Sequence, residues 1–413
     1  MFAASLGALE QTLLLASRNL LRQRRRAALA LLIICGGVIT FLLAGGFINW
    51  VLESMRESTI HSQLGHVQIT RPGYLREGLG DPYRYLLPAD TGAARENAPA
   101  SLRTLAPRLS FNGLLSKGDD TISFIGEGVD PVLEAPIAKA ITIAEGRSLE
   151  ESPVDSVLLG VGLAANISAR PGDTVVLLGT TAEGGINAVE LTVAGLFATT
   201  TKAYDDTALR VPIEVARRLM RVEGATSWVL LLDQTEQTDD VVAELRQRLP
   251  ADQFEVIPWS DLADFYNKTV VLFSQQVGVI RILIALIVVL SISNTLTMAV
   301  IERTAEIGTS MAIGVRRSGI LSQFVLEGAL LGLAGGLIGV ALGLIVGTLV
   351  SIIGIPMPPP PGMAMGFIGE ISISPKLALD GFLLAFLTTL LASIFPAWKA
   401  SRMIIVDALR HQR

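Results

Sequence analysis

Long apolar runs alternate with polar stretches along the chain, and four of these runs are long enough to cross a membrane. A helix needs about 20 mainly apolar residues to cross a hydrocarbon layer of about 30 Å. The four runs extend roughly over Ala27 to Asn49, Val277 to Ile301, Ile320 to Ile353 and Leu377 to Phe395. The pattern therefore predicts a multi-span α-helical membrane protein with four transmembrane helices.

The region between the first two runs, roughly His61 to Ser260, contains short apolar patterns typical of the strands and helices of a mixed α/β domain. Alternating apolar and polar positions predict strands at His66–Thr70, Thr121–Gly126, Thr174–Leu178, Val189–Leu196, Ala208–Val211 and Trp228–Leu232. Helices are predicted at Ile213–Arg221, which begins just after a proline, and at Thr238–Leu249. The four-helix membrane part is thus expected to carry a folded domain between its first and second helices.

Apolar spacing also continues beyond the first two membrane runs. Steps of three, four or seven residues relate Ile48, Leu52, Met55 and Thr59 after the first run, and Phe265, Leu272 and Val279 before the second. We predict that the two helices extend outside the bilayer as a paired stalk. Plain helix packing uses the same residues.

Composition and charge agree with a membrane protein and predict its orientation. Half of the 413 residues are hydrophobic, only 17% are charged, and the mean hydropathy is +0.52, which is unusual for a soluble globular protein. Basic residues flank the runs at Arg18, Arg22, Arg24, Arg25 and Arg26, at Arg303, Arg316 and Arg317, and at Lys399, Arg402, Arg410 and Arg413. Four crossings place all these sets on one side, which the positive-inside rule makes cytoplasmic. Both termini are then cytoplasmic and the domain is extracytoplasmic.

The N-terminal segment has two interpretations. Apolar residues followed by arginines over Ser5–Arg26 predict an amphipathic elbow in the inner interface. A cleaved signal peptide is the alternative, because small residues at Leu43–Gly46 follow an apolar run. Cleavage would leave three spans, whereas the charge pattern needs an even number. Cys35, the single cysteine, lies inside the first predicted span, so no disulfide can form within the chain.

A charged segment between the second and third runs, Glu302 to Arg317, is the most informative part of the sequence. Ile307, Met311 and Val315 recur every four residues and predict one apolar stripe on a helix. The segment is polar, helix-compatible and bounded by membrane spans, so we interpret it as a docking element for a soluble partner; an ordinary cytoplasmic loop is the alternative.

This segment resembles the coupling helix of ABC transporter permeases of the MacB, FtsX and LolC/LolE superfamily, nearest to the LolC/LolE group. The family pattern Arg-x-x-Glu-Ile-Gly-x-x-x-Ala-x-Gly is matched by Arg303, Glu306, Ile307, Gly308, Ala312 and Gly314. Further similar segments are Gly160–Ala164, Gly172–Val175, Pro396–Ser401 and Val406–Arg410. The resemblance implies ATPase-coupling residues at Glu302, Arg303, Glu306, Ile307, Gly308, Met311, Ala312 and Gly314.

The resemblance also implies the partners and the activity. We expect a permease subunit in the bacterial inner membrane that pairs with an identical or a different permease and with separate ABC ATPase subunits. ATP and Mg²⁺ are expected on the ATPase, with no cofactor on this chain. Mechanotransmission through the stalk would then export or extract a lipidated or amphipathic substrate, with a periplasmic adaptor, a lipoprotein and membrane lipid as further candidate partners and no nucleic acid.

Other functions remain as alternatives or are disfavoured. An FtsX-like scaffold that activates a cell-wall hydrolase is the main alternative, and the neighbouring genes would discriminate between the two. None of the six lysines follows a glycine, so the chain has no P-loop of its own. The three histidines and one cysteine form no recognisable metal set. An enzyme is therefore not expected.

Glycines and one acidic residue stand out in the third run. Gly335, Gly339, Gly343 and Gly347 step by four residues, as do Gly328, Gly332 and Gly336. Rows of small residues allow membrane helices to approach closely, so we interpret them as packing surfaces. Gly354, at the outer end, is expected to tolerate a larger side chain. Glu327 is costly at membrane depth. It is interpreted either as an anchor, which reaches the lipid head groups or pairs with an arginine such as Arg303, or as a coupling residue.

These inferences divide the chain as follows. The predicted parts are the elbow, 1–26; first helix and stalk, 27–60; extracytoplasmic domain, 61–260; stalk and second helix, 261–301; coupling helix, 302–319; third helix, 320–353; proline-rich outer loop, 354–376; fourth helix, 377–396; and cytoplasmic tail, 397–413.

Overall fold

The structure is a computed structural model and describes residues 16, 18, 22, 24–78, 80–199, 201–358 and 367–404. These residues form two compact units. A helical unit combines the chain up to Leu52 with Thr269–Ile355 and the residues from Ile368 on, and an α/β unit contains Glu53–Lys268. Most of the predicted elbow, and the similar segment Val406–Arg410, lie outside the described residues.

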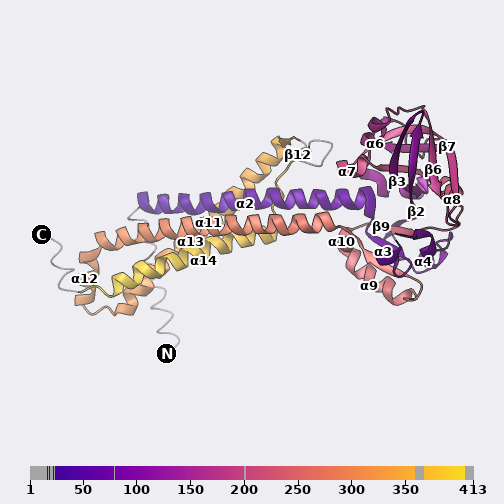
Figure 1. Cartoon of the computed structure of the whole chain (residues 1–413). Coiled ribbons are helices and arrows are strands. Elements are labelled where there is room, and N and C mark those ends of the chain that lie inside the picture. The colour runs from indigo at the N-terminus through magenta and orange to yellow at the C-terminus, as the bar shows by residue number, and fades with distance from the viewer. Residues whose placement is uncertain are drawn as a thin grey trace. The chain divides into compact units, whose positions relative to one another are not determined.

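Four long helices carry the apolar runs, as the sequence predicts (Figure 1). They are α2 (Arg24–Thr59), α11 (Asp264–Glu302), α13 (Arg317–Ile353) and α14 (Pro375–Ser401). Each is long and apolar enough to cross a membrane. The short helix α12 (Thr304–Ala312) connects α11 to α13, and the strands β11 (Ile355–Met357) and β12 (Phe367–Gly369) follow α13. The prediction of four membrane helices is confirmed.

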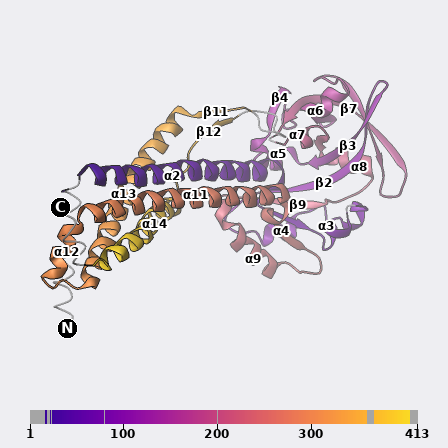
Figure 2. The same cartoon turned by 60° about the vertical axis from the view of Figure 1, so that its left-hand side comes forward.

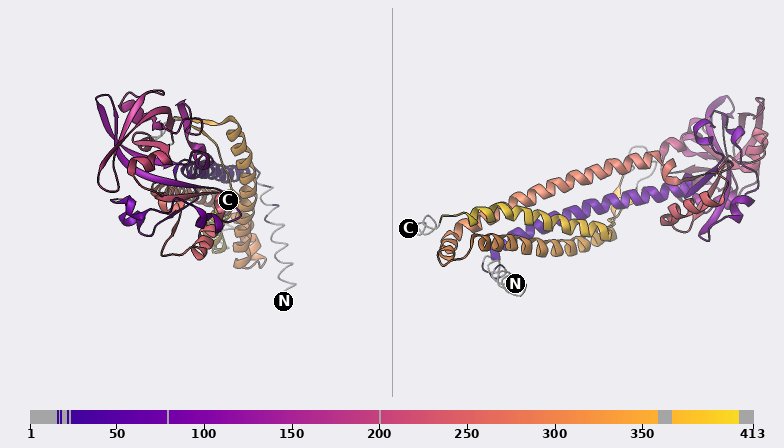
Figure 3. Two further views of the ribbon diagram at one scale, coloured as in Figure 1. Left: turned by 90° about the vertical axis from the view of Figure 1, so that its right-hand side faces the viewer. Right: turned by 90° about the horizontal axis from the view of Figure 1, so that it is seen from below.

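Two glycine faces place α13 between α2 and α14. A Cβ atom on Gly339 would lie 2.8 Å from Cβ of Val38, and one on Gly335 or Gly343 would meet Ile34 or Leu42, also on α2. The second row, Gly328, Gly332 and Gly336, would meet Ser393, Thr389 and Phe382 on α14 in the same way. Gly347 faces Ile373, in the loop before α14. Figure 3 shows α13 and α14 side by side.

Both α2 and α11 continue beyond their apolar runs, as the stalk prediction requires, but the residues predicted to pair on α11 are wrong. Phe265, Leu272 and Val279, which the seven-residue spacing selected, are all more than half exposed. The buried residues of this helix lie further along, at Ile284, Val288, Ile292, Leu296, Ala299 and Val300. The spacing fails because the exposed face of this helix is also apolar, so periodicity alone does not distinguish its two faces.

The α/β unit is built on one ten-stranded sheet (Figure 2). Its order is β10-β1-β9-β2-β3-β8-β5-β7-β4, with β6 paired to β2 and β7. The strands are β1 (Val67–Thr70), β2 (Leu102–Lys117), β3 (Asp120–Val129), β4 (Thr142–Gly146), β5 (Ser156–Gly160), β6 (Thr174–Thr180), β7 (Ile186–Ala198), β8 (Ala208–Pro212), β9 (Ser227–Leu232) and β10 (Glu255–Pro258). All pairs are antiparallel except β3–β8 and β5–β7.

Short helices cover the sheet. They are α3 (Tyr74–Glu77), α4 (Gly92–Glu96), α5 (Pro131–Glu134), α6 (Val161–Asn166), α7 (Lys202–Asp205), α8 (Ile213–Met220), α9 (Thr238–Arg248) and α10 (Trp259–Leu262), with 3-10 turns at η2 (Pro82–Tyr85), η3 (Ile137–Ala140) and η4 (Thr235–Gln237). One π-helical turn, η1 (Ile60–Leu64), continues α2 directly. Each strand and helix predicted for this region lies at an observed one.

The long strand β2 joins the two cores of the α/β unit. Leu105 packs in one core around Trp228 and α9, whereas Leu109, Phe111 and Leu115 pack in the other, under α6 and α8. The first half of β2 pairs with β9 and the second half with β3 and β6. The strand therefore holds the two halves of the sheet in one unit.

Candidate functional site

The candidate site is α12 and the turn that follows it. At its start, α11 ends at Glu302, Arg303 leaves the helical conformation, and α12 begins at Thr304. At its end, Gly314 has φ +105°. The amide of Val315 donates to the carbonyl of Ser310 at 3.1 Å, and that of Gly314 to the carbonyl of Met311 at 3.1 Å. This Schellman arrangement needs a left-handed residue, which explains a glycine at position 314.

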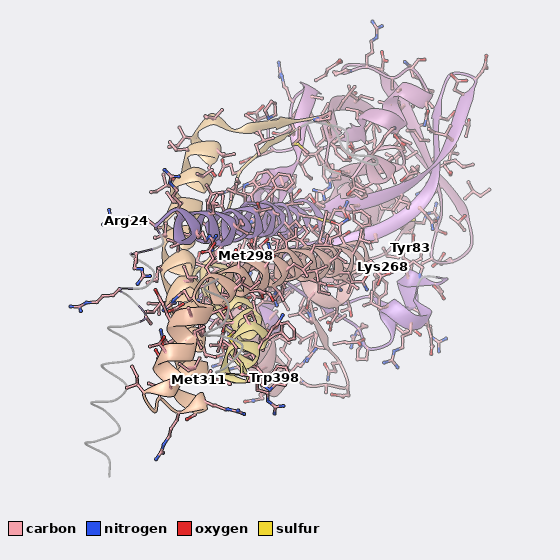
Figure 4. The ribbon with its side chains drawn as sticks, turned by 90° about the vertical axis from the view of Figure 1, so that its left-hand side faces the viewer. Arg24, Tyr83, Lys268, Met298, Met311 and Trp398 are labelled. Atoms are coloured by element: carbon pink, nitrogen blue, oxygen red, sulfur yellow. The ribbon has the colours of Figure 1, made fainter. Side chains whose placement is uncertain are left out.

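One face of α12 is buried against the neighbouring helices. Ile307 and Met311 belong to an apolar cluster, and Gly308 between them is also buried. The other members of the cluster are Val300 of α11, Ile320 and Phe324 of α13, and Ala397 and Ala400 of α14. Figure 4 labels Met311 and, near the end of α14, Trp398. Through this cluster α12 packs against both α13 and α14.

The opposite face and the following turn are exposed. Ile313 is 82% exposed and Val315 is 46% exposed. Thr309, Ala312, Gly314, Arg316 and Arg317 are exposed beside them. Ile307 and Met311 share one apolar face, as predicted, but the prediction is wrong for Val315, because the helix ends at Ala312 and the Schellman turn directs the chain away before Val315. Of the predicted coupling residues, Glu302, Glu306, Ala312 and Gly314 are exposed, whereas Ile307, Gly308 and Met311 are buried.

Arginines at the start of α2 and just before it contact the two exposed carboxylates of the site. Arg22 donates to Glu306, and Arg26 donates to Glu302 through both terminal nitrogens. Arg303 approaches Glu306 from the other side, with Nε 3.4 Å from Oε2. The hydrogen bond from Arg22, with support from Arg303, holds the pKa of Glu306 below its usual range. The Glu306 carboxylate is thus ionised at neutral pH, and the contacts of Arg22 and Arg26 connect the start of α2 to the site.

The buried carboxylate of Glu327 contacts the same arginine. Arg303 Nη1 donates to Glu327 Oε1 at 3.0 Å, and the Arg303 guanidinium lies 5.5 Å from the Phe324 ring centroid. Glu327 is almost fully buried on α13. Of the two arrangements that the sequence leaves open for anchoring Glu327, the structure has the one with Arg303. The pair fixes the junction of α11 and α12 onto α13.

Comparison with protein-family models finds two matches that together span most of the chain. Residues 27–248 match the MacB-like periplasmic core domain, and residues 278–405 match the FtsX-like permease C-terminal region. The second match contains α12 and every residue of the candidate site from Arg303 to Glu327.

Similar full-length proteins include three permeases. An uncharacterized ABC transporter permease of Methanocaldococcus jannaschii is 27% identical over 65% of this chain and 65% of its own. The lipoprotein-releasing system transmembrane protein LolC of Xylella fastidiosa is 26% identical over 74% of this chain and 77% of its own. The macrolide export ATP-binding/permease protein MacB of Hyphomonas neptunium is 27% identical over 73% of this chain but 46% of its own. The chain thus spans about two thirds, three quarters and half of these relatives.

Among solved structures, the periplasmic region of MacB from Actinobacillus actinomycetemcomitans covers 52% of this chain and 97% of its own, at 14% identity and a TM-score of 0.38.

Proposed function

Because the chain belongs to the family of ABC transporter permeases with a MacB-like periplasmic core domain and an FtsX-like C-terminal region, we propose that α12 and its following turn bind a separate ATP-hydrolysing subunit. The chain would be a non-catalytic subunit that converts ATP hydrolysis elsewhere into a conformational change of its α/β domain. ATP and Mg²⁺ would bind the partner, and the permease would work with a second, identical or different, permease chain.

The main support for this proposal is that α12 and its following turn have one buried side and one exposed side. Ile313 and Val315 are apolar yet exposed, and Arg316 and Arg317 border them. An exposed apolar group with a charged rim is typical of a protein–protein contact. On its other side, α12 is fixed to α13 and α14 by Met311 and by the Arg303–Glu327 pair. A partner that moves the exposed side would therefore move two membrane helices.

The proposed orientation follows from the same site. An ATPase that hydrolyses cellular ATP must bind from the cytoplasm, so α12 and both termini would be cytoplasmic and the α/β domain extracytoplasmic, in the inner membrane. The positive-inside distribution of arginine and lysine supports this orientation. Relatives named for lipoprotein release and macrolide export support export or extraction of a lipidated or amphipathic substrate, with a periplasmic adaptor or lipoprotein as a further partner.

The docking proposal is tested with Ile313→Asp. The chain is co-purified with its candidate ATPase, and bound ATPase and ATP hydrolysis are measured. Burying a carboxylate in the contact should weaken binding more than about tenfold, since an unpaired buried charge costs several kcal/mol. Ile186→Asp is the matched control, because Ile186 is equally exposed, at 82%, but lies on β7. Equal binding by both variants and the wild type would contradict docking at α12.

The substrate proposal needs a separate measurement. Proteoliposomes that contain the permease and its ATPase should release a diacylated test peptide in the presence of ATP, and should not release the same peptide without acyl chains. Equal release of both peptides, or ATP-independent release, would contradict a lipidated or amphipathic substrate.

A further inference from the structure

A largely buried cluster of two arginines and two glutamates lies inside the α/β unit. Arg108 comes from β2, Arg210 from β8, Glu127 from β3 and Glu134 from α5. The Arg108 Nε atom donates to Glu134 Oε2 at 3.2 Å, and Arg210 Nη2 lies 2.9 Å from Glu127 Oε2. Arg210 Nη1 lies 3.4 Å from Glu134 Oε1. Two arginines and two glutamates thus meet in a site where Arg108, Arg210 and Glu134 are nearly fully buried and Glu127 is partly exposed.

Such a cluster is a costly way to stabilise a fold. Removing charged groups from water costs several kcal/mol each, so buried ion pairs are weak evidence for stability. Burial works to raise the pKa of Glu127, but Arg210 and Arg108 outweigh it and hold that pKa below its usual range. The Glu127 carboxylate thus stays ionised, and the contacts of the two arginines with the backbone indicate what the cluster does.

Both arginines also donate to backbone carbonyls at the end of α2. Arg210 Nη2 donates to the carbonyl of Ser62 at 2.9 Å, and Arg108 Nη1 donates to the carbonyl of Gln63. Both carbonyls belong to η1, the π-helical turn that ends the continuous helix begun by α2. The last carbonyls of a helix have no partner within it, and they carry the negative end of its dipole. A guanidinium group both donates hydrogen bonds to these carbonyls and places a positive charge at the negative end of the dipole.

Other groups complete this helix end. The carbonyl of Ile60 accepts from the amide of Gly65 at 2.9 Å, and that of Leu64 accepts from the Gln68 side chain at 3.0 Å. Ile60 is fully buried in an apolar cluster with Trp259 and Ala263, which precede α11, and Tyr266 of α11 packs against the same cluster. The end of α2 and the start of α11 therefore share one attachment point on the sheet.

We propose that Arg108 and Arg210, held by Glu134 and Glu127, are positioning residues that fasten the end of α2 to the sheet, so that displacement of α2 moves the whole α/β domain instead of unwinding η1. This inference rests on the proposed function, since it concerns how the domain receives the movement. Arginine suits the role because the planar guanidinium of Arg210 presents separate donors to two carboxylates and a carbonyl in a fixed geometry, whereas a lysine ammonium is a compact charge on a flexible stem.

The test uses Arg210→Lys in the full-length chain bound to its ATPase, and measures hydrogen–deuterium exchange with and without ATP and vanadate. Lysine keeps the charge balance of the cluster, and exchange across β3 reports whether the domain is folded. Without nucleotide, amides of residues 60–65 should exchange about tenfold faster than in the wild type, as expected when a hydrogen bond to a charged group is lost. Arg218→Lys is the control, because Arg218 forms an exposed pair with Asp155 elsewhere on the same unit.

The nucleotide comparison separates this inference from the proposed function. In the wild type, ATP and vanadate should change exchange both in α12 and in β1, which follows η1. In Arg210→Lys the change should persist in α12 and be lost from β1. An unchanged α12 in the wild type would overturn the docking proposal and this inference with it. A change that reaches β1 equally in wild type and variant would overturn this inference alone, as would unaltered exchange of residues 60–65. Should β3 exchange show that Arg210→Lys is unfolded, Arg108→Lys removes the contact with Gln63 and is read in the same way.

Discussion

Arg303 and Glu327 are 24 residues apart in the chain, yet they form a 3.0 Å hydrogen-bonded ion pair that connects the start of α12 to the interior of α13. Both side chains are largely buried, with exposed fractions of 13% and 4%. A buried pair of this kind adds little net stability compared with apolar residues, but removing one partner is expensive. The pair therefore acts mainly as a constraint on where α12 can lie relative to α13.

Arg303→Met should destabilise the protein strongly because it leaves the Glu327 carboxylate buried without this cation. The expected loss is about 3–5 kcal/mol, the usual penalty for breaking a buried pair. Thermal unfolding of the detergent-purified protein measures it. Arg303→Met combined with Glu327→Leu should recover most of the loss, because no unpaired charge remains. A double variant that loses as much as the two single variants together would contradict this assignment.

Substitutions of glycine test the packing of α13 against α2. Gly339→Ala should lower stability by about 1–3 kcal/mol, the usual cost of overpacking, since its Cβ would lie 2.8 Å from Val38 Cβ and 3.2 Å from Cys35 Cα. Gly36→Ala on α2 is the control, because no atom lies within 4 Å of its Cβ. Alanine favours helix over glycine by about 1 kcal/mol, so this control should be neutral or stabilising. If thermal unfolding showed that both substitutions change stability in the same direction, close packing at Gly339 would be contradicted.

Gly354 is not a suitable control, contrary to the expectation from its position at the outer end of the span. Its φ is +73°, and a Cβ would lie 2.5 Å from the Ile368 side chain. Position along a helix does not reveal a left-handed residue at its end, whereas backbone geometry does.

Acid should destabilise the α/β unit through His66. Its Nδ1 accepts from the amide of Leu232 at 3.0 Å, so the ring must be neutral, and Nε2 lies 3.0 Å from Thr235 Oγ1. Burial and the nearby His61 lower the pKa of His66 from 6.5 to about 4. Because the folded-state pKa is depressed, the unfolded state binds the proton first. Neutral His66 therefore contributes roughly 3 kcal/mol to the free energy of unfolding. This contribution is present above pH 6.5 and is lost as the pH falls to 4.

Urea unfolding of the wild type and His66→Asn between pH 4 and 7 measures this effect. Asparagine can accept from the same amide through Oδ1 but does not titrate in this range. The wild type should lose stability steeply below pH 6.5 and the variant less so. Parallel pH profiles would exclude His66 as the cause.

The membrane helices could be predicted from sequence because length and composition alone decide them. Strand β2 was missed because Pro107, Asn112 and Gly113 interrupt its pattern. Pro107 is tolerated there although it cannot donate a hydrogen bond, while neighbouring residues keep the pairing with β9. Tertiary packing outweighs local propensity in this strand.

The candidate site was only partly predictable. Sequence identified the segment around α12 but placed Val315 on the same helix face as Ile307 and Met311. The spacing of apolar residues does not show that Gly314 ends the helix before Val315. The cluster of Arg108, Glu134 and Arg210 was missed, because its members lie on separate elements up to 102 residues apart. One local signal existed: Arg210 stands in the otherwise uncharged strand Ala208–Pro212, all of whose residues are buried.

Cysteine labelling tests the proposed orientation of the chain in the membrane. Asp119, in the turn between β2 and β3, and Thr309, on α12, are both exposed, so a cysteine at either position is accessible to a reagent on its own side of the membrane. Cys35 is buried and contributes little background. In intact cells a membrane-impermeant maleimide should modify Asp119→Cys but not Thr309→Cys, because four crossings place them on opposite sides. After permeabilisation both should react, which shows that Thr309→Cys was shielded by the membrane and not by the protein. Reaction of Thr309→Cys in intact cells would contradict the orientation, and with it the access of a cytoplasmic ATPase to α12.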